Sequence, residues 1–185
     1  MKKILMISII LITSDLYSQS LKDQIIVIRT SEGNITIHLD ANRAPITVNN
    51  FINLIESDYF DGSIFHRVIE NFMIQGGGFD SNMNDLESSK KIPNESGNGL
   101  SNLRGTISMA RTSDPHSANA QFFINTKDNR PLNPKSGRWG YAVFGTVIEG
   151  MDVVDRISKK PTGPKGRFMS DVPVETVLIK DILIE

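Results

Sequence analysis

The sequence predicts a mainly β fold, a β-barrel of short strands with an α-helix over each open end. Three observations lead to this prediction. Short runs rich in β-branched and aromatic residues recur along the chain, and turn residues separate them. Two isolated segments carry apolar residues at the three- and four-residue steps of a helix. The final run, 177–184, has the composition of a strand and is expected to close the sheet.

The first 20 residues differ in composition from the rest and predict a secretory signal peptide. Two lysines precede a mostly apolar run over 4–12, and serines then supply small residues for cleavage. The apolar run is too short to span a bilayer comfortably, so we expect no stable membrane insertion. A buried first strand is the alternative, but the polar residues that follow cannot continue it. We therefore expect a signal peptide over 1–20, one domain over 21–185 and a periplasmic location, with full secretion as the other destination.

Charge and cysteine content exclude several classes of function. The chain has 20 Lys and Arg and 21 Asp and Glu, and without the two lysines and one aspartate of the leader these fall to 18 and 20. So small a net charge gives no general attraction to nucleic acid or anionic lipid. The absence of cysteine excludes disulfides and thiolate chemistry. His38, His66 and His116 lack the close spacing of a metal pair, so we expect no metal site.

A strand hairpin and a helix are predicted at the start of the domain. Residues 24–29 are rich in Ile and Val, residues 34–39 alternate apolar and polar side chains, and turn residues join them. Pro45 then suits the first turn of a helix, where a missing amide hydrogen costs nothing. An apolar stripe follows along this helix to near residue 57, at Val48, Phe51, Ile52 and Ile55. We expect the helix to cover an apolar opening of the barrel.

The most informative stretch covers 65–78 and has the sequence FHRVIENFMIQGGG. Alternation along a strand predicts that Phe65 and Arg67 share a face, with a bend near residues 70–71. The glycines 76–78 are not followed by Lys and then Ser or Thr, which disfavours a phosphate cradle. We expect them to form a tight connection with permissive backbone.

Beyond the bend, Phe72 and Met73 are expected to form an apolar shelf beside the Arg67 guanidinium. The Gln75 amide is expected to lie close enough to orient that cation. Such a site suits a substrate that is apolar but carries backbone carbonyls. The alternative is an arginine whose stem packs on the surface while its head stays in water.

A long surface excursion is predicted over 80–102, where Ser, Asn, Lys, Asp and Gly replace the apolar pattern. Short strands follow at 105–110 and 121–125, and Asp114 and Pro115 enforce the loop between them. Later segments predict a strand, a short helix, a loop and the closing strand, over 141–147, 150–159, 161–173 and 177–184.

A second group of interest begins at Gln121, where two phenylalanines follow on one strand. Because Phe122 and Phe123 point to opposite faces, one ring is expected in the core and the other in an outer site. The alternative buries both rings in the core. Leu132, in a proline-rich loop, and Tyr141 can complete an apolar cup beside the outer ring.

The chain closely resembles the cyclophilin-type peptidyl-prolyl cis-trans isomerases, in particular their bacterial members. The resemblance covers nearly all of 24–185. It is carried by FHRVIENFMIQGGGF at 65–79, GTISMARTSDPHSANAQFFIN at 105–125 and YAVFGTVIEGMDVVDRI at 141–157. It implies a closed eight-stranded antiparallel barrel with a helix at each end and an active groove on the outer face.

The same resemblance implies an isomerase of the bonds that precede proline, with no cofactor. Its partners would be proline-containing polypeptides and unfolded exported proteins, and a monomer is the default because nothing in the sequence suggests an oligomer interface. Arg67 would be the essential cation, with Gln75 and Gln121 bonded to it or to the substrate backbone. Ala110 and Arg111 would border the peptide channel. The pocket for the proline ring would be formed by Phe72, Met73, Phe123 and Leu132.

This chain departs from the commonest family pattern at three positions. Tyr141 stands where many members have a histidine, and its ring and hydroxyl should preserve catalysis. Pro131 stands near the position where other members have a tryptophan that contacts cyclosporin, and the loss of this tryptophan weighs against tight cyclosporin binding. Trp139 lies in the neighbouring loop, in a different register. Arg111 replaces the usual Asn and adds a charge that would favour acidic substrates.

Two rival functions remain open on the sequence alone. The pocket would also serve a chaperone or binding module that grips proline-containing segments without turnover. A purely structural secreted barrel would make the pocket incidental. The presence of both Arg67 and Gln75 favours the enzyme.

Overall fold

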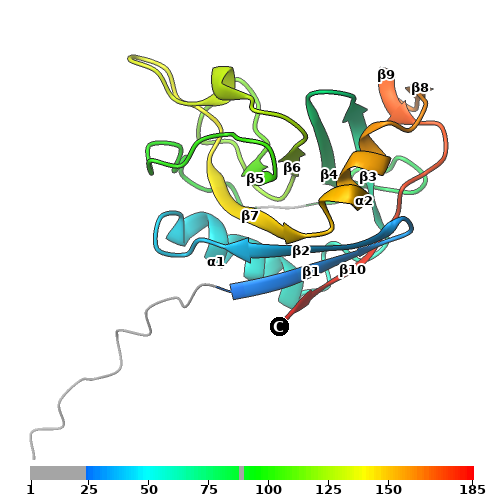
Figure 1. Ribbon diagram of the computed structural model, residues 1–185, viewed down its shortest axis with the longest axis horizontal. Coiled ribbons are helices and arrows are strands. Elements are labelled where there is room, and N and C mark those ends of the chain that lie inside the picture. Colours follow the sequence, from blue (N-terminus) through cyan, green and yellow to red (C-terminus); the bar gives the residue numbers. More distant parts are fainter. Residues whose placement is uncertain (1–23, 88–89) are drawn as a thin grey trace, which may run out of the picture.

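The fold is an antiparallel barrel, seen in a computed structural model that describes residues 24–87 and 90–185. The predicted signal peptide over 1–20 lies outside the described residues. Eight strands form one sheet in the order β10-β1-β2-β7-β5-β6-β4-β3 (Figure 1). These strands are β1 (Gln24–Thr30), β2 (Gly33–Leu39), β3 (Ser63–Ile69), β4 (Met73–Asp80), β5 (Thr106–Met109), β6 (Phe122–Asn125), β7 (Val143–Glu149) and β10 (Ile179–Ile184).

The two edge strands of that order, β3 and β10, meet and leave the barrel nearly closed. The Phe65 amide donates to the Val177 carbonyl at 3.0 Å, and the Gly62 amide donates to the Ile179 carbonyl at 3.0 Å. Ile64 forms an isolated antiparallel bridge with Leu178 between these two bonds. The predicted eight-stranded antiparallel barrel and its closing strand are therefore confirmed.

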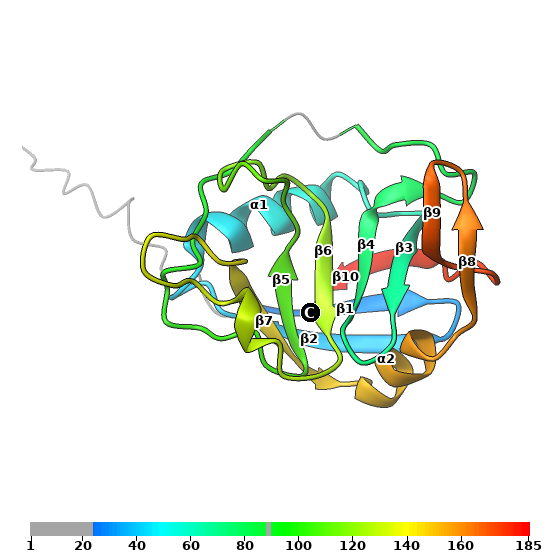
Figure 2. The ribbon, with the colours of Figure 1, turned by 90° about the horizontal axis from the view of Figure 1, so that it is seen from above.

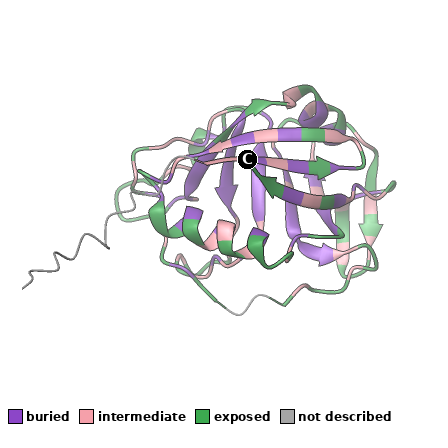
Figure 3. Cartoon of the chain, turned by 90° about the horizontal axis from the view of Figure 1, so that it is seen from below, coloured by how far each residue is buried: buried purple, intermediate pink, exposed green. Residues whose placement is uncertain are grey.

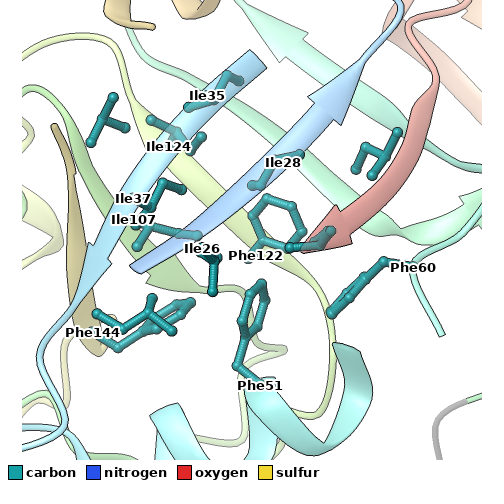
Figure 4. Close-up of a cluster of buried hydrophobic side chains, with 14 of the residues drawn as sticks. Ile26, Ile28, Ile35, Ile37, Phe51, Phe60, Ile107, Phe122, Ile124 and Phe144 are labelled. Atoms are coloured by element: carbon teal, nitrogen blue, oxygen red, sulfur yellow. The ribbon is translucent and has the colours of Figure 1, made fainter. Parts of the chain in front are cut away.

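The two predicted helices, α1 (Pro45–Glu56) and α2 (Met151–Ser158), lie at opposite ends of the barrel (Figure 2). Phe51 of α1 points into the core toward Phe122 and Phe144, with ring centroids 5.5 and 5.1 Å away (Figure 4). In Figure 3, α1 is buried along one side and exposed along the other, as the predicted apolar stripe requires. No helix in the described part of the chain is long and apolar enough to cross a membrane.

The N-terminus of α1 is capped by a residue from the long excursion. The Glu95 carboxylate accepts hydrogen bonds from the amides of Ile46 at 3.1 Å and Thr47 at 2.8 Å, and from the Thr47 hydroxyl at 2.7 Å. A carboxylate is favourable there because the first amides of a helix lack partners and carry partial positive charge. Ile92, which is only 3% exposed, also packs into the core. The excursion is therefore anchored at two points.

A second, two-stranded sheet contradicts one prediction. Residues 161–173, expected to be a loop, form a hairpin of β8 (Thr162–Lys165) and β9 (Phe168–Pro173), and β9 packs beside β3 (Figures 1 and 2). The Phe168 ring lies 5.2 Å from that of Phe79 and 5.7 Å from that of His66. This hairpin is stabilised by contacts with strands that are far away in the sequence. Its own residues show little periodicity, which is why the sequence did not predict it.

Candidate active site

A β-bulge in β3 turns Arg67 to the outside of the barrel. Phe65 is opposite Gly76 and Arg67 is opposite Gln75, so two residues of β3 match one of β4. The extra residue, His66, interrupts the alternation of faces. Phe65 stays in the core while Arg67 lines an outer pocket. The prediction that they share a face is therefore wrong, because strict alternation holds only where every residue has a partner.

The outer pocket has a volume of about 110 Å³ and lies over β3, β4 and β6. A closed apolar cavity of about 150 Å³ holds a benzene ring, so this open pocket suits one small ring. The structure brings together nine of the ten predicted site residues, and the tenth, Gln121, lines the adjoining hollows. The nine are Arg67, Phe72, Met73, Gln75, Ala110, Arg111, Phe123, Leu132 and Tyr141.

The two phenylalanines of β6 separate as predicted. Phe122 is 0% exposed and belongs to the core cluster, whereas Phe123, although only 4% exposed, lies outside that cluster and lines the outer pocket. The Phe123 and Tyr141 rings meet edge to face, with centroids 5.6 Å apart. Such pairs are favourable beyond the area that they bury, so Tyr141 helps to fix the Phe123 ring.

Two glutamines link the cation to the next strand. Gln75 accepts a long hydrogen bond from Arg67 Nη1 at 3.4 Å and donates to Gln121 Oε1 at 2.9 Å. Because an amide has one accepting and one donating end, the bond to Gln121 leaves the Gln75 oxygen facing Arg67. The predicted orientation of the guanidinium by Gln75 agrees with this geometry.

The three consecutive glycines lie inside β4 rather than in a tight connection, so that prediction is wrong. An added Cβ on Gly78 would stand 2.7 Å from Gln121 Cγ. An added Cβ on Gly77 would instead meet the rings of Phe60 and Phe122 in the core. Close approach on both faces of the strand therefore requires the glycines.

Arg111 joins the two loops that border the pocket. Its guanidinium donates to the carbonyls of Thr112, Trp139 and Gly140 at 2.9 to 3.1 Å. It also lies 4.6 Å above the centroid of the Tyr141 ring, within the range of a cation–π contact. Arg111 therefore holds the Tyr141 wall of the pocket, and its preference for acidic substrates stays a prediction.

A buried asparagine network joins the Phe72 and Tyr141 sides of the pocket, and it was not predicted from the sequence. Asn129 Nδ2 donates to the Phe72 carbonyl and to Asn125 Oδ1, both at 2.7 Å. Asn102 Nδ2 donates to the Tyr141 carbonyl at 3.2 Å, and Asn125 donates to Asn102 at 3.2 Å. The only signal in the sequence was the clustering of Asn beside strand ends.

His66 is 1% exposed and packs against the rings of Phe79 and Phe168, with ring centroids 4.6 and 5.7 Å away. Burial lowers its pKa to about 4, so the ring is neutral at neutral pH. Its Nδ1 has no hydrogen-bond partner among the described residues. Within that same part of the chain, no group of three or more His, Asp or Glu residues is placed to hold a metal ion.

Comparison with known proteins gives concordant matches. A family model described as cyclophilin type peptidyl-prolyl cis-trans isomerase/CLD matches residues 25–182. A peptidyl-prolyl cis-trans isomerase of Acinetobacter baylyi is 48% identical over 91% of this chain and 89% of its own. Peptidyl-prolyl cis-trans isomerase B of Escherichia coli is 47% identical over 86% of this chain and 98% of its own.

A similar fold is found among solved structures. The crystal structure of a cyclophilin-type isomerase from Cryptosporidium parvum, determined in the presence of the dipeptide Ala-Pro, has a TM-score of 0.71 to this chain. The two are 28% identical, and the match covers 88% of this chain and 99% of that one.

Proposed function

This chain is a member of the cyclophilin-type peptidyl-prolyl cis-trans isomerases, and we propose that isomerisation takes place in the pocket beside Arg67. One observation carries the proposal. The Arg67 guanidinium, held by Gln75, stands at the edge of a small apolar pocket of about 110 Å³. Isomerisation of a bond before proline is served by this combination, because the cation can donate to the proline nitrogen while the apolar side chains hold the proline ring.

The chemical problem is a barrier that arises from resonance. Partial double-bond character gives the peptide bond a rotation barrier of roughly 18–20 kcal/mol. For a bond before proline, the two isomers differ by only about 0.5–1 kcal/mol, so exchange is slow although neither isomer is strongly favoured. An acceleration of about 10⁵ requires a barrier lower by about 7 kcal/mol. The catalyst has to weaken resonance, and it makes or breaks no covalent bond.

In this proposal, Arg67 donates a hydrogen bond to the proline nitrogen in the twisted state. As the bond rotates, the nitrogen becomes pyramidal and regains a lone pair that can accept the bond. A charged donor beside apolar groups is stronger than the same donor in water. Because the planar nitrogen accepts poorly, the interaction strengthens only at the twisted state, which is the condition for catalysis rather than mere binding.

The apolar side chains hold the proline ring while the carbonyl side rotates. We assign this role to Phe72, Met73, Phe123 and Leu132, which line one pocket. The Ala-Pro dipeptide present with the Cryptosporidium parvum relative supports a proline-containing substrate. We assign to Gln75 and Gln121 hydrogen bonds with the substrate backbone or with Arg67. Ala110 and Arg111 border the channel in which the peptide lies. Tyr141 completes the cup through its contact with Phe123.

For the cellular role, we propose that the domain over 21–185 assists the folding of exported proteins in the periplasm. The support is the order of basic, apolar and small residues over 1–20. Fractionation of the native host and N-terminal sequencing of the protein test this role. A mature form that begins near residue 21 outside the cytoplasm is expected, and an uncleaved cytoplasmic form would contradict it.

Exchange NMR on a short Ala-Pro peptide tests the site. Replacing Arg67→Ala should lower the catalysed cis-to-trans rate by about 10²- to 10³-fold, the usual loss for one electrostatic donor. The matched variant Arg67→Lys keeps the charge but loses the planar fork, so its rate should fall between the two. Equal melting temperatures would show that all three proteins are folded. Full turnover in folded Arg67→Ala would place catalysis elsewhere, and retained peptide binding without turnover in the native protein would favour a binding module.

A further inference from the structure

A carboxylate from the β8–β9 hairpin lies beside the proposed catalytic cation. Asp171 Oδ2 is 3.8 Å from Arg67 Nε, within ion-pair distance. We propose that Asp171 is a positioning residue, which holds the Arg67 guanidinium in the orientation that serves the proline nitrogen. This inference rests on the proposed role of Arg67.

The guanidinium is held from two sides. Asp171 faces Nε, and Gln75 accepts from Nη1 at 3.4 Å. A guanidinium has five N–H donors in one plane, so these two partners leave terminal N–H groups for a substrate. A point charge such as Lys has no such plane to fix. Two contacts on different edges therefore restrict both the position and the rotation of the fork.

The Arg67–Asp171 pair is not expected to act as a structural ion pair, because it contributes little to the stability of the fold. The side chains of Arg67 and Asp171 are 38% and 34% exposed. Water screens such pairs, so they contribute little to the free energy of unfolding. An unrestrained arginine side chain samples many rotamers, however, so even a weak contact raises the fraction of molecules with the cation in place. We therefore expect an effect on turnover rather than on unfolding.

The hairpin is anchored on both sides of Asp171. Phe168 packs against the rings of His66 and Phe79, and Val172 is 2% exposed. Asp171 itself has φ of 67°, in the left-handed region that few non-glycine residues adopt. Asp and Asn tolerate this region better than most residues. The anchored backbone therefore fixes where the carboxylate lies relative to β3.

The test compares Asp171→Asn with a matched control, Asp155→Asn. Asn keeps the shape and the backbone preference of Asp171 but removes its charge. Asp155 pairs with Arg104 at 2.8 Å with similar exposure, outside the pocket residues. We expect kcat on a proline peptide to fall by about 3- to 10-fold in Asp171→Asn with KM unchanged, as expected for an interaction that acts at the transition state. The control should keep native kcat and KM.

A double-mutant cycle identifies the residue through which Asp171 acts. In an Arg67→Ala background, Asp171→Asn should cause no further loss of kcat. The ¹⁵Nε–H signal of Arg67 should also shift in Asp171→Asn and not in Asp155→Asn. An unchanged or raised kcat in Asp171→Asn, or a loss that persists without Arg67, would overturn this inference alone. Full turnover in folded Arg67→Ala would overturn the proposed function and this inference together.

Discussion

The inner and outer faces of β3, β4 and β6 use similar residues for different purposes. On the inner face, Phe65 and Phe122 are 1% and 0% exposed and meet edge to face at 6.0 Å. On the outer face, Phe123 belongs to a pocket whose polar members, Arg67 and Gln75, are partly exposed. The difference shows that one set of strands provides stability on one side and chemistry on the other. Substitutions on the two faces should therefore be separable by measurement.

The adjacent rings of β6 give the largest expected effect. Phe122→Ala removes a ring from the packed core and should lower the free energy of unfolding by about 3–5 kcal/mol. Phe123→Ala should cost less stability and should also raise KM for a proline peptide, because this ring, though only 4% exposed, lines a pocket that is open to water. Urea unfolding and peptide kinetics on both variants measure the two effects. Equal losses of stability would show that the two faces are not distinct.

His66 fits neither face: its side chain lies outside the core of the barrel but is buried, because β9 covers it. Its pKa is about 4 in the folded state and 6.5 when exposed, because burial disfavours the charged ring. Between these values the unfolded state binds more protons, so stability falls as the pH falls from about 6.5 to 4. The loss from pH 7 to pH 4.5 should be about 2 kcal/mol.

The variant His66→Gln should lack this part of the pH dependence, whatever its stability at pH 7. Urea unfolding of both proteins at pH 7 and pH 4.5 gives the comparison, and the carboxylates common to both cancel. The same pH dependence in both proteins would mean that His66 titrates in the folded state as it does in water.

The neighbouring glycines Gly77 and Gly78 of β4 face the core and the pocket, and Gly78→Ala gives the smallest expected effect. Gly77 has φ of +75°, and an added Cβ would stand 2.9 Å from the Phe60 ring, so Gly77→Ala should cost about 1–3 kcal/mol of stability. Gly78→Ala should displace the Gln121 side chain from Gln75 and lower kcat several-fold (roughly 1 kcal/mol). Thermal unfolding and exchange NMR measure these outcomes. A stable, fully active Gly78→Ala protein would show that Gln121 does not support the site.

Much of the fold could be predicted because it follows from local patterns. The apolar stripe at Val48, Phe51 and Ile55 matches the buried side of α1. The alternation of Phe122 and Phe123 gave the correct faces, because β6 pairs without a bulge. Residues that are close in sequence on a regular strand or helix share one geometry, so their positions relative to one another need no tertiary information.

Other features depended on residues far apart in the chain. Nothing near Pro45 indicates that Glu95 caps α1. The hairpin over 162–173 has weak periodicity, and it is fixed by rings from β3 and β4. Asp171 was missed for that reason, since its proximity to Arg67 exists only once the hairpin has packed.

The sequence by itself determined the strands of the barrel, the two helices and, through its family resemblance, the residues of the pocket. The tertiary structure alone decided that a bulge at His66 turns Arg67 outward, that the glycines lie within a strand, and that Asp171 reaches the cation. The physical reason is the range of the interactions. Periodicity reports which side of a local element avoids water, whereas pairing register and long-range contacts depend on free energies shared between distant segments.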